Sequence, residues 1–206
     1  MLKINGPRGS KLPFFEQFFW VPDDHSALGY KKIVSFGFAF FLLHLAMVLL
    51  LETVDSYDFS IGGNTWFFYP PAFVRLSAFL ILGFWSVPFI FLAQIAINPF
   101  DLAWIDHFLL ASFTAIGAPV GVSIMARTVL ISRDLVNLNG SRLFMLSLAA
   151  ACVNALAIRS ALLITGINPD LFPGLHVTII GDTLGAWFVM YIIKIALTLA
   201  SYKRHR

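Results

Sequence analysis

Long apolar runs separated by short polar connections dominate the chain. Five runs are plain, at residues 33–51, 72–97, 102–126, 143–165 and 176–200. A helix needs about 20 apolar residues to cross a bilayer. The pattern therefore predicts an all-α fold, a polytopic helical membrane bundle.

The second run is long enough for one tilted helix or for two short ones. It contains the stretch GFWSVP at residues 83–88, in which a glycine stands five residues before a proline. Glycine and proline at this spacing are a break signal. The sequence predicts two helices here, the first near 71–84 and the second near 86–98.

The distribution of charge supports the break, because Lys and Arg gather in cytoplasmic loops. The basic connections precede the first run, join the third and fourth runs, and follow the last. They carry Lys3, Arg8, Lys11, Lys31, Lys32, Arg127, Arg133, Arg142, Lys203, Arg204 and Arg206. The other connections are acidic and contain no Lys or Arg. With two helices in the long run, every basic connection falls inside, which predicts six transmembrane helices and two cytoplasmic termini.

Three regions follow from this pattern. Residues 1–32 are predicted to be a cytoplasmic interfacial segment, because residues 12–20 are aromatic and flanked by charge. Residues 33–200 form the six-helix transmembrane domain. Residues 201–206 form a basic cytoplasmic tail.

Composition agrees with a membrane location and narrows the function. Of the 206 residues 59% are hydrophobic and 12% charged, and the mean hydropathy is +0.83. The lipid bilayer is therefore an expected partner, whereas a net charge of +3 without a basic aromatic region argues against nucleic acid. The one cysteine, Cys152, can form neither an internal disulfide nor a multi-cysteine metal site. No catalytic motif is present, so neither an enzyme nor a cofactor or metal is expected.

Charged side chains inside predicted spans are costly and are candidate functional residues. At 1.5 Å per residue, Arg75, Arg159 and Asp182 all lie about 6–9 Å from the outer end of their helices. Asn154 lies deeper on the helix of Arg159. Two interpretations stay open: a structural bridge between helices, or a cluster with a charge of about +1 that binds a small anionic ligand.

A lone histidine also lies near the middle of the first span. His44 is expected to bond to a neighbouring helix.

Two short motifs suggest how these residues are held. Pro70 and Pro71 stand where a helix begins, and proline suits the first turn because its missing N–H is not needed there. Gly181 and Gly185 have i, i+4 spacing and predict a flat stripe for close helix contact, which would hold Asp182 beside its neighbours.

The stretches YPPA at 69–72 and GDTLG at 181–185 together resemble the first type of MASE domain, a family of bacterial membrane-associated sensors. Tyr69 stands where that family prefers Trp, and Phe73 where it prefers Gly. The resemblance implies a multi-pass sensory module in the bacterial inner membrane. Such a module would bind a small ligand in its outer half and signal to a cytoplasmic or membrane protein partner, which here would be a separate chain.

Two other classes of function remain open. Six helices in about 200 residues is also the size of the substrate-binding S-component of energy-coupling-factor transporters. The chain is equally consistent with a structural subunit or assembly factor of a membrane complex, in which case the charges are purely structural.

Overall fold

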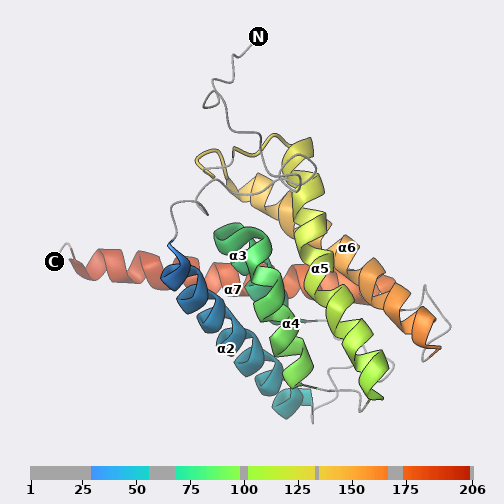
Figure 1. The fold of residues 1–206 in the computed structure, drawn as a ribbon. Coiled ribbons are helices and arrows are strands. Elements are labelled where there is room, and N and C mark those ends of the chain that lie inside the picture. Colours follow the sequence, from blue (N-terminus) through green and yellow to red (C-terminus); the bar gives the residue numbers. More distant parts are fainter. Residues whose placement is uncertain (1–28, 56–67, 98–101, 133–134, 167–173, 205–206) are drawn as a thin grey trace.

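The computed structural model describes residues 29–55, 68–97, 102–132, 135–166 and 174–204, and all regular structure within these ranges is helical. The predicted interfacial segment at residues 12–20 lies outside them. In chain order the elements are α2 (Tyr30–Asp55), α3 (Pro71–Leu82), the 3₁₀ turn η2 (Gly83–Trp85), α4 (Ser86–Ala96), α5 (Trp104–Thr128), α6 (Gly140–Thr165) and α7 (Leu175–Arg204) (Figure 1).

Five segments of the described chain are long and apolar enough to cross a membrane: Tyr30–Leu51, Pro71–Ala96, Trp104–Thr128, Gly140–Thr165 and Leu175–Ile193. The chain is therefore a multi-pass helical membrane protein, which confirms the predicted class. The count of six predicted spans differs from these five, because α3 and α4 together make up one of the five segments.

The break in that segment is at Gly83. Its φ of 55° and ψ of −139° lie in a region that favours glycine, since a Cβ would clash with the backbone there. Val74 of α3 and Ile90 of α4 belong to one buried cluster with Ala78 and Ala115. In one straight helix Val74 and Ile90 would lie about 24 Å apart. The chain therefore folds back, and α3 and α4 form a hairpin.

The hairpin is made of short helices. With 12 residues in α3 and 11 in α4, the two are about 18 and 16 Å long, against a hydrocarbon core of about 30 Å. Both end about two residues before the predicted positions near 84 and 98, α3 because Gly83 leaves helical geometry. The end of α4 lies beside the middle of α2, since Gln94 of α4 contacts His44 of α2.

The hairpin is also joined to α2 by a buried polar contact. His44 Nε2 on α2 lies 2.7 Å from Gln94 Nε2 on α4, and His44 is fully buried. This confirms that His44 bonds to a neighbouring helix. The sequence did not identify Gln94 as its partner.

Helices α5 and α6 lie side by side, and two glycines of α5 bring their backbones together (Figure 1). A Cβ on Gly117 would lie 2.8 Å from Asn154 Cα, and one on Gly121 would lie 2.9 Å from Ala150 Cα. Real Cβ atoms essentially never approach so closely. The two glycines therefore set the separation of the helices, and Gly117 fixes the backbone at Asn154.

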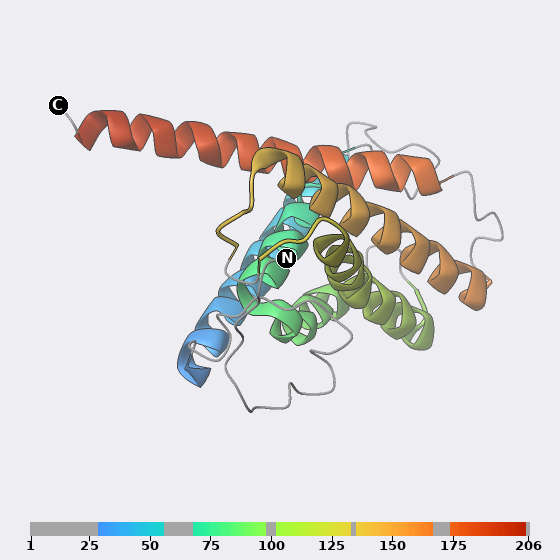
Figure 2. The ribbon, with the colours of Figure 1, turned by 90° about the horizontal axis from the view of Figure 1, so that it is seen from above.

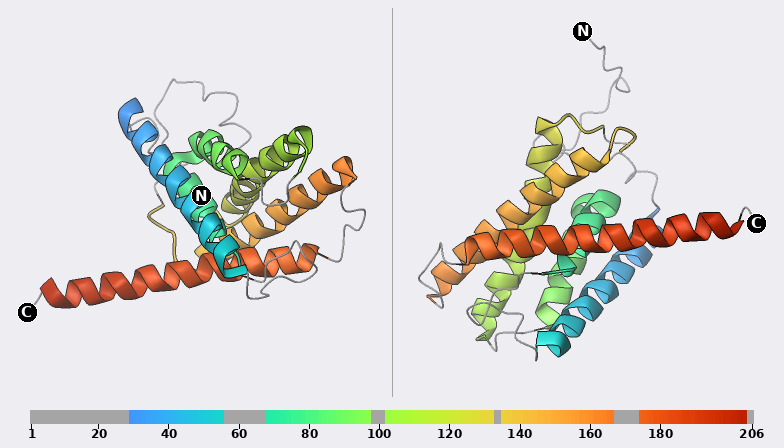
Figure 3. Two further views of the ribbon diagram at one scale, coloured as in Figure 1. Left: turned by 90° about the horizontal axis from the view of Figure 1, so that it is seen from below. Right: turned by 180° about the vertical axis from the view of Figure 1, so that it is seen from behind.

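The longest helix, α7, crosses the other helices, and its C-terminal part extends beyond them (Figures 2 and 3). It contains 30 residues and continues to Arg204. Lys203 and Arg204, expected in a separate tail from 201 to 206, are therefore part of this helix. The side chains of Tyr191, Ile192 and Ile195, in the C-terminal half of α7, are 62%, 48% and 43% exposed.

Candidate functional site

The start of α3 packs directly on the first turns of α7. The Tyr69 backbone N–H donates to the Gly181 carbonyl at 3.0 Å, and a Cβ on Gly185 would lie 2.6 Å from Pro70 N. Pro70 is the N-cap of α3 and Pro71 its first residue. The two motifs singled out in the sequence, Pro70-Pro71 and Gly181–Gly185, thus meet at one contact, which requires a glycine at 185.

One turn into α3, Arg75 reaches across to α7 and α6. Its Nη2 donates to both carboxylate oxygens of Asp182 at 3.0 Å, and its Nη1 donates to Asn154 Oδ1 at 2.9 Å. Asn154 Nδ2 in turn donates to Asp182 Oδ2 at 2.7 Å. The three side chains form a closed hydrogen-bonded triangle, named here the Arg75 cluster, that joins α3, α6 and α7.

The Arg75 cluster is almost completely enclosed. Arg75, Asn154 and Asp182 are 2%, 0% and 4% exposed. Burying charges costs free energy that their attraction only partly offsets, but removing one partner from such a pair costs about 3–5 kcal/mol because the other charge is then uncompensated. The cluster is therefore a strong constraint on how the three helices are placed relative to one another.

The aromatic ring of Tyr69 completes the surroundings of Arg75. The guanidinium carbon lies 5.2 Å from the ring centroid, within the range of a cation–π contact. Trp makes this contact more strongly than Tyr.

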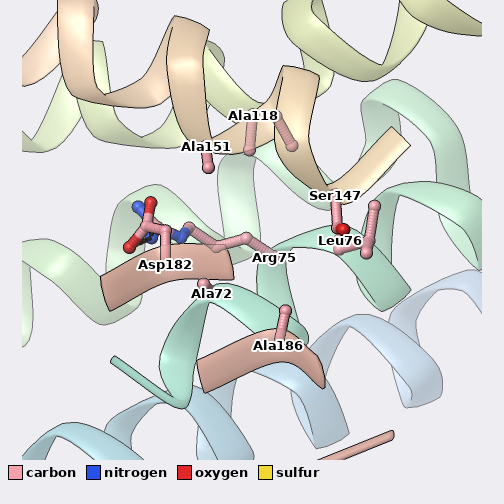
Figure 4. A pocket seen from close by; sticks show the side chains of 9 residues that line it. Ala72, Arg75, Leu76, Ala118, Ser147, Ala151, Asp182 and Ala186 are labelled. Atoms are coloured by element: carbon pink, nitrogen blue, oxygen red, sulfur yellow. Dashed lines mark hydrogen bonds and ion pairs between the residues drawn. The ribbon is translucent and has the colours of Figure 1, made fainter. Parts of the chain in front are cut away.

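A small cavity adjoins the ion pair, lined mainly by alanines. Figure 4 shows Arg75 extending along the α7 backbone to the Asp182 carboxylate, with Ala118 and Ala151 on the opposite side. The space open to the centre of a water molecule is about 10 Å³, which is close to the room that one water needs. In this arrangement the cavity has room for about one water.

The third predicted charge, Arg159, lies elsewhere. Its guanidinium contacts Gly174, at the start of α7, so closely that a Cβ on that glycine would overlap with it. The ion pair of Asp182 is with Arg75. The net charge of the Arg75 cluster is consequently zero, rather than the +1 expected when Arg159 was included.

A further polar contact between α6 and α7 was not foreseen from the sequence. Trp187 Nε1 donates to Ser147 Oγ at 3.0 Å, and Ser147 Oγ donates to the Phe144 carbonyl at 2.8 Å. The Trp187 and Phe144 rings also meet edge to face, with centroids 5.5 Å apart. Single Ser and Trp residues in apolar runs carry no distinguishing spacing, whereas the GxxxG spacing of Gly117 and Gly121 was readable.

No protein-family model matches the chain, and neither a curated protein nor a solved structure matches it significantly. The resemblance to the MASE family stays a prediction.

Proposed function

We propose that this chain is a membrane sensory module that passes a signal through α7 to a separate protein partner. The observation that carries the proposal is the Arg75 cluster, which ties α7 to α3 and α6 by one ion pair and its amide partner. Because α7 continues past the bundle (Figure 3), a change at Asp182 is transmitted along a single helix. A switch requires two arrangements of different ligand affinity, and closing or opening of the ion pair distinguishes two such arrangements.

The contact between the two motif segments supports this proposal. YPPA and GDTLG lie more than 100 positions apart in the chain, yet Tyr69 bonds to Gly181 and Arg75 to Asp182. The segments that resemble the sensor family therefore form one physical unit. That unit is located at the point where α7 is held.

The small cavity argues against the transporter alternative. A substrate-binding component needs a pocket that encloses most of its ligand. The cavity beside the Arg75 cluster has room for about one water. The polar residues that could have lined a substrate pocket are hydrogen-bonded to one another instead.

The proposal includes a topology of six membrane passes in the bacterial inner membrane, with both termini cytoplasmic. The hairpin of α3 and α4 supports an even number, because a hairpin returns the chain to the side from which it entered. The hairpin returns the chain to the same side whether the turn at Gly83–Trp85 reaches the cytoplasmic surface or ends within the membrane. The basic connections then all lie inside, as the charge rule requires.

The test uses a photo-crosslinking amino acid at Tyr191, an exposed position in the C-terminal half of α7, in the full-length protein in its own membranes. Phe36 on α2 is the control position, since it is also exposed, at 44%. We expect a cross-linked signalling enzyme, a nucleotide cyclase or a kinase, at Tyr191 and not at Phe36. An ATPase at Tyr191 would instead show a transporter, and subunits of one large complex would show a scaffold.

The activity of the cross-linked enzyme supplies the second half of the test. It should change when the ion pair is removed in the double variant Arg75→Gln/Asp182→Asn, which leaves no charge in the Arg75 cluster and is expected to fold. Asp106→Asn, outside the Arg75 cluster, should leave it unchanged. Equal enzyme activity in both variants, at equal amounts of protein, contradicts signalling through α7.

A further inference from the structure

The described chain has a second buried charged site at the start of α7, where the side chain of Arg159 from α6 lies. Arg159 is only 4% exposed, and its Nε has no hydrogen-bond partner. Its guanidinium lies against Gly174, the residue that precedes the first turn of α7. No ion pair joins Arg159 to any of the described carboxylates.

The helix terminus facing Arg159 is also electropositive. Gly174 accepts from the Thr178 N–H at 3.0 Å and from the Thr178 hydroxyl at 2.9 Å, so it is the N-cap of α7. The N–H groups of Leu175, His176 and Val177 then have no acceptor within the helix. A helix of this length carries about +0.5 charge at its N-terminus. A guanidinium and a helix N-terminus thus lie against each other, which is unfavourable unless an anion contacts both.

We infer that Arg159 and the first turn of α7 form a binding site for an oxyanion, a carboxylate or a phosphate. The planar guanidinium fork matches the two oxygens of such a group, and helix N–H groups bind the same oxygens. Gly174 is essential to the geometry because any side chain there would occupy the position of the guanidinium. The anion comes from a small soluble molecule or from the headgroup of an anionic lipid, which share this chemistry.

The site is separate from the Arg75 cluster but is coupled to it through two helices. Gly174 and Asp182 lie about 12 Å apart along α7, and Arg159 and Asn154 about 7 Å apart along α6. An anion bound at Arg159 therefore holds α6 and α7, two of the three helices that the Arg75 cluster joins. This inference names the ligand class of the proposed sensory module and rests on that function for its meaning, whereas the binding itself is tested independently of any partner.

The test measures thermal unfolding of the purified full-length protein. In detergent, and in nanodiscs of phosphatidylcholine, phosphate, sulfate and acetate are compared with chloride at equal ionic strength. In a second set of nanodiscs phosphatidylglycerol is added without these salts. We expect at least one of these additions to raise the midpoint by about 3 °C or more at saturation. A response to the salts in phosphatidylcholine identifies a soluble anion, and a response to phosphatidylglycerol alone identifies a headgroup.

Two variants link the response to the site. Arg159→Gln should abolish it and, without added anion, should leave the midpoint equal or higher, because an uncompensated charge has been removed. Gly174→Ala keeps every charge but displaces the guanidinium, so it should also abolish the response. Gly140→Ala, where a Cβ meets open space, and Lys32→Gln, an exposed lysine, should both retain it.

Three results would overturn the inference. One is the absence of any response in the wild-type protein. Another is a response that Arg159→Gln retains. The third is destabilisation of similar size by Arg159→Gln and Asp170→Asn in anion-free buffer, which would mean that the chain's own carboxylate neutralises Arg159. None of these results bears on which protein is cross-linked at Tyr191, so the two proposals fail separately.

Discussion

At the scale of single residues, Asp182 is the position whose chemistry matters most. Asp182→Asn keeps the shape of the side chain but leaves the Arg75 guanidinium buried without a counter-charge. We expect a loss of about 3–5 kcal/mol in the free energy of unfolding. The measurement is a denaturation series in detergent on the wild-type protein and the variant.

The matched control is the double variant Arg75→Gln/Asp182→Asn, which removes both charges together. It should recover a large part of the loss, because a neutral amide pair can still exchange hydrogen bonds at this site. Strictly additive effects of the two single variants would show that the residues are not coupled.

Residue depth was predictable from the sequence, but pairing was not. Counting along the helices placed Arg75, Arg159 and Asp182 at one level and left two arginines as partners for Asp182. The choice depends on how each helix is rotated about its axis, which is set by contacts such as Tyr69 with Gly181. No periodicity within one segment contains that information.

At the scale of the helices, the close approach of α5 and α6 supports the Arg75 cluster from behind. Gly117→Ala would bring a Cβ to within 2.8 Å of Asn154 Cα, and backbone atoms cannot yield as a flexible side chain would. We expect the strain, about 1–3 kcal/mol, to exceed the gain of about 1 kcal/mol from replacing glycine by alanine in a helix.

Gly140→Ala is the reference for the helix effect alone, since its Cβ meets open space. Thermal unfolding should rank Gly117→Ala below the wild-type protein and Gly140→Ala at or above it. An increase in stability for Gly117→Ala would mean that α6 can move away from α5 without cost.

The helix elements themselves were largely predictable. Run length predicted the five long apolar segments of the described chain, and the glycine–proline spacing predicted the break in the second of them. The ends were less predictable, because α3 stops where Gly83 takes a positive φ and α7 continues through residues that charge alone assigned to a tail. Hydropathy reports which residues prefer lipid and carries little information on backbone geometry at a helix end.

At the scale of the whole molecule, the hairpin determines the side on which each connection lies. Reporter fusions after Lys32, Arg142 and Arg206 should give cytoplasmic signals, and fusions at Asp58, Asp101 and Asp170 should give external ones. The reporter at Asp101 discriminates between the six-pass topology and a topology in which residues 71–96 form a single pass. If residues 71–96 crossed the membrane once, a reporter at Asp101 would be cytoplasmic.

The ion pair between Arg75 and Asp182 also has a consequence for how the protein is made. The two residues are 107 positions apart, so at a synthesis rate of about 5–20 residues per second the carboxylate follows the guanidinium by roughly 5–20 s. During that interval the hairpin carries the Arg75 guanidinium, while α7, which supplies the carboxylate, has not yet been made. A chain that stops before α7 keeps an unpaired guanidinium, so the bundle can close only after α7 has been made.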